Sequence, residues 1–164
     1  MTADEGSAAL ATPLGRIALR AGPGGLRAIA FVEAGAGGPA AEAMPPAGEL
    51  LAAAIAELEE YFAGRRRSFA LPLDPRGTPF QLKVWRALAA IPYGATLGYG
   101  ELAARLGRPG GARAVGQALA ANPLPIVLPC HRVVAARGLG GYAGGIRVKR
   151  WLLAHERARS LAAR

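Results

Sequence analysis

The two residues best suited to chemistry stand next to each other in this chain, Cys130 and His131. The thiolate is the reactive form of cysteine, and a neighbouring base or positive charge can generate it from the thiol. Adjacent residues in an extended segment point to opposite faces, so direct contact is not assured and a bridging water could link the pair. A third group should orient the histidine, and Glu156 is the best candidate among the few acids of this half.

A lone cysteine also has a plainer interpretation, since free cysteines are commonly buried and inert. Cys130 is the only cysteine, which excludes an internal disulfide and a four-thiolate zinc site. The chain has two histidines, His131 and His155. We therefore expect no metal site and no cofactor.

The charge of the chain is divided unevenly within a formal net charge of +9. Residues 1–77 hold seven Lys and Arg against nine Asp and Glu, whereas residues 78–164 hold thirteen against two. A basic half joined to a mildly acidic one points to a polyanion as partner of the basic half. Most basic residues are arginine, whose planar fork suits phosphate, although codon usage in a GC-rich genome would explain that ratio equally well.

The termini and apolar runs predict a cytoplasmic protein without membrane association. The N-terminus reads Met1-Thr2-Ala3-Asp4-Glu5 with no apolar core after it, which argues against a secretory signal. The clearest apolar run, residues 124–128, is far too short to span a bilayer and contains a proline.

The first half of the chain has the pattern of a small sheet with one helix. Alternating apolar residues over 15–21 and 26–33, on either side of a Gly-Pro-Gly-Gly cluster, predict a β-hairpin. From Glu49 the apolar residues recur at intervals of three to four and predict a helix. A second alternation over 69–73 predicts another strand.

At residues 74–77 the pattern of apolar residues changes from one typical of strands to one typical of helices. We take this segment as a domain junction and expect domains 1–76 and 77–164. Thr78-Pro79-Phe80-Gln81 is a capping box with proline at the first helical position, and it predicts a helix that stops before Pro92. The second domain is expected to be mainly helical, with further helices over residues 99–106, 112–121 and 146–161.

The helices over 99–106 and 112–121 surround a tight glycine-containing turn, which is typical of a helix-turn-helix. The second of them is slim and carries one charged side chain, Arg113. A major-groove reader usually presents Arg, Asn or Gln to the base edges, so a slim helix could instead enter the minor groove and read its shape. The alternative, which periodicity alone favours, is that its Ala and Gly merely permit close packing.

Pro129-Cys130-His131-Arg132-Val133 resembles the active-site motif of the O6-alkylguanine-DNA alkyltransferases, also called methylated-DNA–protein-cysteine methyltransferases. The first half is similar more loosely, through Tyr61-Phe62-Ala63-Gly64 and Leu71-Pro72-Leu73. Over residues 77–157 the following motifs resemble the family in order and spacing: Gly77-Thr78-Pro79-Phe80-Gln81, Val84-Trp85, Ile91-Pro92-Tyr93-Gly94, Arg113-Ala114-Val115-Gly116, Asn122-Pro123, Gly141-Tyr142-Ala143-Gly144-Gly145 and Lys149 through Leu152-Leu153.

This resemblance implies an RNase H-like α/β N-terminal domain, with a small sheet plus helix, followed by a mainly helical C-terminal domain with a helix-turn-helix. It implies DNA repair by direct damage reversal, in which the alkyl group of O6-alkylguanine moves to Cys130 once per molecule. O4-alkylthymine is left open as a second substrate. The implied partner is double-stranded DNA, bound through the minor groove by a monomer, with cooperative binding left open.

The resemblance also implies a role for each matching residue of the reaction centre. Cys130 would accept the alkyl group, His131 would act as its base through water, and Glu156 would hydrogen-bond His131. Asn122 would support the site by hydrogen bonding across a turn. Tyr99 would help rotate the nucleotide, and its hydroxyl could protonate the leaving guanine.

Further residues are implied in DNA binding and in the base pocket. Arg113 would fill the gap left in the base stack. Gly98 and Ala143 stand where family members often have serine, which puts the substrate range in question rather than the reaction. The other implied DNA contacts are Tyr99, Ala114, Gly116, Gln117 and Ala120. The implied pocket residues are Tyr142, Ala143, Gly144, Val133 and Lys149.

Three other functions stay open from the sequence. Non-enzymatic alkyltransferase-like damage sensors share the second domain but lack the acceptor cysteine, which is present here. A helix-turn-helix regulator would tolerate Cys130→Ser, but Arg113 alone is a poor set of base-reading side chains. A cysteine hydrolase would need turnover and an oxyanion hole that the sequence does not reveal.

Overall fold

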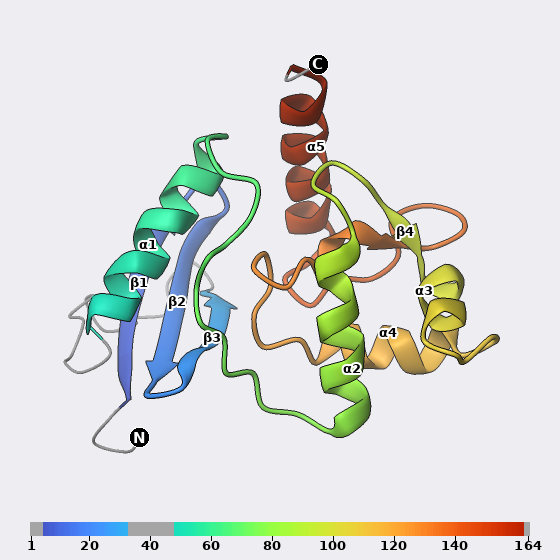
Figure 1. Ribbon diagram of the computed structural model, residues 1–164. Helices are drawn as coiled ribbons and strands as arrows, with labels where there is room; N and C mark the ends of the chain where they lie inside the picture. Colours follow the sequence, from blue (N-terminus) through green and yellow to red (C-terminus); the bar gives the residue numbers. More distant parts are fainter. Residues whose placement is uncertain (1–4, 33–47, 163–164) are drawn as a thin grey trace. The chain divides into compact units, whose positions relative to one another are not determined.

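The computed structural model describes residues 5–32 and 48–162 (Figure 1). The chain divides into two compact units, Met1–Arg76 and Gly77–Arg164. The first unit holds a three-stranded sheet and one helix, and the second consists mainly of short helices. None of the helices in the described ranges is long and apolar enough to cross a membrane.

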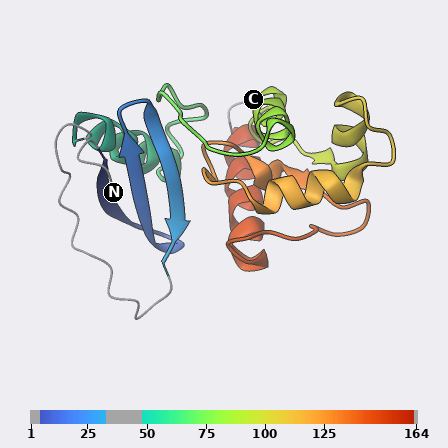
Figure 2. The same cartoon turned by 90° about the horizontal axis from the view of Figure 1, so that it is seen from below.

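Three antiparallel strands form the sheet of the first unit, β1 (Gly6–Thr12), β2 (Gly15–Gly22) and β3 (Gly25–Phe31), and they lie side by side in Figure 2. The hairpin predicted over 15–21 and 26–33 is confirmed by β2 and β3, while Glu33 lies outside the described residues. Strand β1 was not predicted, because its run of small residues gives a weak strand signal.

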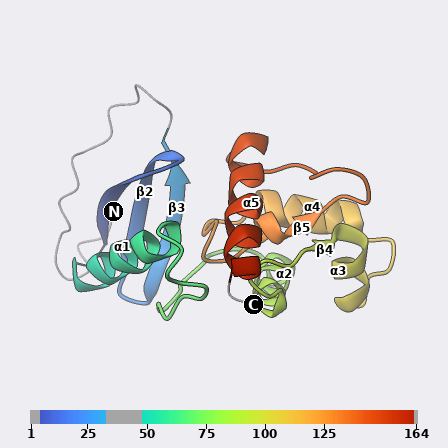
Figure 3. The ribbon, with the colours of Figure 1, turned by 90° about the horizontal axis from the view of Figure 1, so that it is seen from above.

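Helix α1 (Gly48–Phe62) covers one face of this sheet (Figures 1 and 3) and confirms the helix predicted from Glu49. Because side chains alternate along a strand, one face of the sheet is apolar and lies under the helix. Each fully buried leucine contributes about 1.5–3 kcal/mol, so this interface accounts for much of the stability of the unit. The buried side chains are Leu51, Ala54, Leu58 and Tyr61 of the helix and Ile17, Leu19, Leu26 and Ile29 of the sheet.

The strand predicted over 69–73 is wrong. This segment makes only an isolated parallel bridge, in which Leu73 lies opposite Leu26. The Leu26 N–H donates to the Pro72 carbonyl at 2.8 Å, and the Asp74 N–H donates to the Leu26 carbonyl at 2.9 Å. Since Pro72 has no N–H of its own, the pairing does not continue as a ladder.

The second unit places its helices where the sequence predicted them, with ends shifted by one or two residues. Helix α4 (Ala112–Ala120) packs against α2 (Pro79–Ala87) and α3 (Tyr99–Arg105) (Figure 3). Helix α5 (Ile146–Ala162) packs against the 3-10 turn η2 (Cys130–Arg132). The Trp85 indole N–H donates to the Ala118 carbonyl at 2.8 Å, which ties α2 to α4. The elements are α2 (Pro79–Ala87), η1 (Leu88–Ala90), β4 (Leu97–Gly98), α3 (Tyr99–Arg105), α4 (Ala112–Ala120), η2 (Cys130–Arg132), β5 (Val133–Val134) and α5 (Ile146–Ala162).

Helices α3 and α4 form the predicted helix-turn-helix around a turn that needs two glycines. Gly107 and Gly110 have φ angles of 76° and 81°, a left-handed conformation that costs other residues about 1 kcal/mol or more. The turn therefore redirects the chain within the six residues 106–111 and brings the two helices into contact.

Strands β4 and β5 form a parallel pair that the sequence did not predict. Leu97 lies opposite Val133, and Gly98 opposite Val134. A strand of two residues is too short to show an alternation of apolar and polar side chains. The pair places Tyr99, the first residue of α3, next to the segment that follows Cys130.

The contribution of the capping box at the start of α2 to stability can be tested by substitution of Thr78. The Gln81 N–H donates to the Thr78 hydroxyl at 3.1 Å, and the Thr78 N–H donates to the Gln81 side chain at 2.9 Å. We expect Thr78→Ala to lower the free energy of unfolding by about 1 kcal/mol. Thr78→Ser keeps the acceptor and should stay close to the parent chain. Urea titration with an unchanged slope checks both variants, and equal stability of all three proteins would contradict the role of this cap.

Candidate active site

Cys130 stands at the first residue of η2, a short 3-10 turn, and not in an extended segment. The expectation that Cys130 and His131 point to opposite faces of an extended segment therefore does not apply. Among the described contacts no hydrogen bond joins their side chains. The Cys130 N–H donates to the Leu128 carbonyl at 2.7 Å, and the residue is only 7% exposed. The cysteine is thus fixed through its backbone with little contact to solvent.

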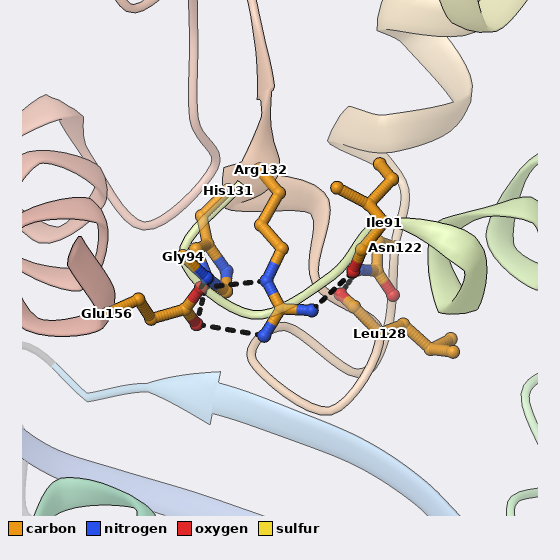
Figure 4. A network of polar contacts seen from close by, with 7 residues as sticks. All are labelled: Ile91, Gly94, Asn122, Leu128, His131, Arg132 and Glu156. Carbon is orange, nitrogen blue, oxygen red and sulfur yellow. Dashed lines mark hydrogen bonds and ion pairs between the residues drawn. The ribbon is translucent and has the colours of Figure 1, made fainter. Parts of the chain in front are cut away.

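The side chain of Asn122 holds the segment that delivers the cysteine (Figure 4). Its amide donates to the Leu128 carbonyl at 2.9 Å, while its oxygen accepts from the Leu124 N–H at 2.9 Å. Between these contacts the buried Ile126 has a φ of 76°, which is strained for a β-branched residue. Asn122 therefore locks a turn that would otherwise relax, and the position of Cys130 depends on that turn.

Behind the cysteine lies a buried group of three charged or titratable side chains, His131, Arg132 and Glu156 (Figure 4). His131 Nε2 lies 2.7 Å from Glu156 Oε2. Arg132 donates from Nε to Glu156 Oε1 at 2.8 Å and from Nη2 to Oε2 at 3.1 Å. The family resemblance implied the His131–Glu156 contact but gave no role to Arg132. The position of Arg132 next to His131 in the chain was the one available signal for its part in this group.

Burial and charge shift the pKa values of these groups in different directions. Burial raises the pKa of the Cys130 thiol, and the charge of Lys149 offsets part of that rise. Burial lowers the pKa of His131, against the opposing effect of Glu156. Burial acts to raise the pKa of Glu156, but hydrogen bonds from His131 and Arg132 and their charges outweigh it and hold that pKa well below its usual range. The resting site therefore combines a thiol, a neutral imidazole and an ionised carboxylate.

Lys149 is a fully buried lysine that joins three separate segments. Its Nζ donates to the carbonyls of Val133 at 2.7 Å and Gly141 at 3.0 Å, and to the Tyr99 hydroxyl at 3.4 Å. The Tyr99 hydroxyl itself donates to the Gly141 carbonyl at 3.3 Å. Burial lowers the pKa of Lys149, and its neighbourhood to Cys130 opposes that shift. The lysine therefore connects β5, the glycine-rich loop and the start of α3.

A cavity of about 970 Å³ opens next to these groups. Its lining includes Cys130, Tyr99, Arg113 and Tyr142, together with many small residues of α4 and of the loops after β5. Burial raises the pKa of the Tyr142 hydroxyl well above its usual value, so this side chain stays protonated. The cavity is large enough for a flat heterocycle. No three His, Cys, Asp or Glu side chains in the described parts of the chain are grouped so as to hold a metal ion.

Gly140 shows how closely the loop and Tyr99 fit together on one side of the cavity. Its φ is 74°, and a Cβ placed on it would lie 2.7 Å from a ring carbon of Tyr99 and 2.8 Å from its hydroxyl oxygen. Any side chain at this position would therefore displace the tyrosine ring.

Comparison with known proteins assigns both units to one family. Residues 7–75 match the family described as 6-O-methylguanine DNA methyltransferase, ribonuclease-like domain, and residues 79–158 match its DNA binding domain. The chain belongs to the O6-alkylguanine-DNA alkyltransferases. The predicted fold class, an RNase H-like α/β domain followed by a helical DNA-binding domain, is confirmed by these matches.

Individual alkyltransferases are similar over much of the chain. The methylated-DNA–protein-cysteine methyltransferase of Mycobacterium tuberculosis is 54% identical over 110 residues, which cover 66% of this chain and 67% of the relative. That of Salmonella typhimurium is 57% identical over 102 residues, covering 61% and 60%. The crystal structure of M. tuberculosis OGT in complex with DNA has a TM-score of 0.80 at 43% identity and covers 93% of each chain.

The structure brings together some, but not all, of the residues that the alkyltransferase resemblance implied. Those that line the cavity are Tyr99, Arg113, Gly116, Ala120, Cys130, Tyr142 and Ala143. His131, Glu156, Val133 and Lys149 are buried behind it, and Asn122 lies in the turn before the cysteine. The remaining implied residues, Ala114, Gln117 and Gly144, are not among the lining residues, and Gln117 is exposed on α4. Small lining residues that the sequence did not single out are Gly100, Ala135 and Ala136.

The two lysines of the chain provide a matched test of this alkyltransferase site. Lys149→Met would leave the buried carbonyls of Val133 and Gly141 without their donor, so we expect a loss of about 2 kcal/mol or more in the free energy of unfolding. Lys83 is exposed and donates to the Leu106 carbonyl at 3.1 Å, so Lys83→Met should cost less than about 1 kcal/mol. Chemical denaturation of both variants measures the difference, and an equal cost would contradict the joining role of Lys149.

Proposed function

We propose that Cys130 is the residue to which this chain transfers the alkyl group of O6-alkylguanine in DNA. DNA repair by alkyl transfer to a protein cysteine is the activity of the family to which the chain belongs. The observation that carries the assignment is the place of Cys130, the only cysteine, at the cavity and next in the chain to His131, which pairs with Glu156 in the interior.

The chemistry begins with a thiol that is not ionised in the resting protein. Because burial raises the pKa of Cys130, the thiolate must be formed when substrate is bound, with His131 taking the proton through water. His131 suits this task because burial lowers the pKa of its imidazole and so favours the neutral form that a base needs. A buried thiol of this kind is also protected from reaction with other electrophiles, which suits a cysteine that can be used once.

The transfer itself is an in-line displacement at the alkyl carbon. The bond from sulfur to carbon forms while the bond from carbon to O6 breaks, and the guanine leaves with that electron pair. The Tyr99 hydroxyl can supply the proton that the guanine needs, since burial raises its pKa and keeps it protonated. The product is a thioether, which neither water nor thiols readily cleave, so each molecule acts once.

The reacting atom of the substrate lies inside the duplex, so the base must leave the stack before transfer. Extrusion of a base costs a few kcal/mol, and insertion of a side chain into the gap offsets part of that cost. We place α4 in the minor groove, because Gly116 and Ala120 give this helix a smooth surface beside the cavity. Arg113, exposed at the cavity edge, is the side chain proposed to fill the gap, in a complex with one protein monomer.

No observation favours the damage-sensor alternative. Such sensors lack the acceptor cysteine, whereas this chain has Cys130 at the cavity. The cysteine therefore supports a group-transfer function over simple recognition.

Intact-mass measurement tests the proposed acceptor directly. Incubation with duplex DNA carrying one O6-methylguanine should add one methylene unit per chain, saturate at one equivalent, and map to the peptide that contains Cys130. Cys130→Ser should bind the same DNA without any mass change. Damage-selective binding by the parent chain without mass gain would instead identify a sensor.

Arg113 provides a test of base extrusion. Arg113→Ala should slow transfer from duplex DNA about tenfold or more, while transfer from the free base O6-benzylguanine should change less than about twofold, because only the duplex has a stack to fill. Arg86→Ala removes the same charge from exposed α2, outside the cavity lining, and should leave both rates near those of the parent chain. Single-turnover rates measure the effect, and an equal loss on both substrates would refute stack filling.

A further inference from the structure

Among the arginines that the structure describes, Arg132 alone is buried, and each of its three guanidinium nitrogens donates a hydrogen bond. The residue is 7% exposed, and three of its nitrogens donate to protein acceptors (Figure 4). Two of them contact the two oxygens of Glu156, and Nη1 donates to the Ile91 carbonyl at 2.8 Å. A two-point contact of this kind fixes both the orientation and the charge of a carboxylate.

The contact with Glu156 determines which ring nitrogen of His131 carries the proton. An ionised carboxylate can only accept hydrogen bonds, so the 2.7 Å contact requires a proton on His131 Nε2. In a neutral imidazole the other nitrogen, Nδ1, is then the unprotonated one. Nδ1 is buried and has no hydrogen-bond partner among the residues that the structure describes, which leaves its lone pair available.

Burial lowers the pKa of His131, and the charges of the neighbouring groups add to that shift or oppose it. A lone buried carboxylate at 2.7 Å would draw a proton onto His131 and form an ion pair, since an opposite charge nearby favours the charged form. The Arg132 guanidinium, at 2.8 and 3.1 Å from the two carboxylate oxygens, opposes that effect of Glu156. The other charged group that acts on the imidazole is Lys149 of α5, which also lowers the pKa of His131.

We propose that Arg132 is a positioning residue for the transfer reaction, which cancels the charge of Glu156 and thereby keeps His131 a neutral base with Nδ1 unprotonated. The carboxylate then holds the histidine in one tautomer without charging it. Arg132 does not contact the cavity and touches no reacting atom. Its effect on the reaction passes through Glu156 and His131, and the inference rests on the proposed function of that pair.

A purely structural role for Arg132 makes a different prediction. The contact with the Ile91 carbonyl anchors the segment before Gly94, whose N–H lies 3.4 Å from Glu156 Oε1. Loss of an anchor would slow transfer by the same factor at every pH. Loss of charge cancellation would instead move the pH dependence of the rate and the titration of His131.

The test is the pH dependence of Arg132→Met, measured in two independent ways on the full chain. Loss of the cation should raise the pKa of His131, since the carboxylate within hydrogen-bond range then stabilises the imidazolium with no guanidinium to oppose it. The acid limb of the single-turnover rate should move to higher pH by the same amount. Nitrogen NMR of the free protein follows the same titration, and with only His131 and His155 the two rings are readily assigned.

Two further variants separate charge from packing. Arg132→Met/Glu156→Gln removes both charges, so the acid limb should return to the parent position or below it although the contacts are still missing. Arg132→Lys keeps the charge but loses the two-point contact, so the rate should fall with little movement of the acid limb. Circular dichroism establishes that each variant is folded.

The outcomes divide cleanly between the two hypotheses. A His131 titration that is unmoved in folded Arg132→Met, or a rate lowered equally at all pH values, would overturn the charge-cancelling role. Because the NMR titration needs no DNA and no transfer, it still reports on Arg132 if the chain transfers no alkyl group. In that case the proposed function fails and the inference about the buried group is judged separately.

Discussion

The contact between the Glu156 carboxylate and its donors is the constraint on which the second unit depends. It joins α5 to η2 through His131 and Arg132, and to the segment after η1 through the Gly94 N–H. An ion in the interior is tolerated only if its hydrogen-bonding capacity is met, because an unpaired buried charge costs several kcal/mol. The elements that meet at Glu156 therefore have to assemble together, and Cys130 is positioned as part of that assembly.

Lys149 plays a comparable part on the other side of the cysteine. It lies seven residues before Glu156 on α5, so the two side chains emerge from the same face of the helix two turns apart. One helix thus supplies both a buried cation and a buried anion, and the chain segments around the cysteine are held between them. Packing alone would not select one conformation for loops so rich in glycine and alanine, whereas directional hydrogen bonds do.

The sequence predicted most of the elements but only part of the way they meet. Periodicity identified α1, the hairpin of β2 and β3, and the helices of the second unit, because each is long enough to show a repeat. It missed β1, whose small residues carry little signal, and β4 with β5, which are too short to show any. It wrongly predicted a strand over 69–73, where Pro72 removes the donor that a ladder needs.

For the site, the residues of the reaction centre were named through a family resemblance, and their contacts came from the structure. The His131–Glu156 contact spans 25 positions in the chain, and nothing in local spacing fixes such a pair. Arg132 was visible beside His131, but its burial depends on the carboxylate that α5 brings to it. Exposed basic residues outnumber it in this half of the chain, so charge alone could not single it out.

The fit between Gly140 and Tyr99 has a consequence for how such proteins can diverge. The glycine is confined by its φ of 74° and by a ring that lies 2.7 Å from where a side chain would begin. Position 140 therefore cannot drift towards larger residues: a smaller side chain at the head of α3 would make room for a Cβ but would not relieve the backbone strain. In a set of related sequences this loop position should stay glycine even where the residue at the head of α3 varies.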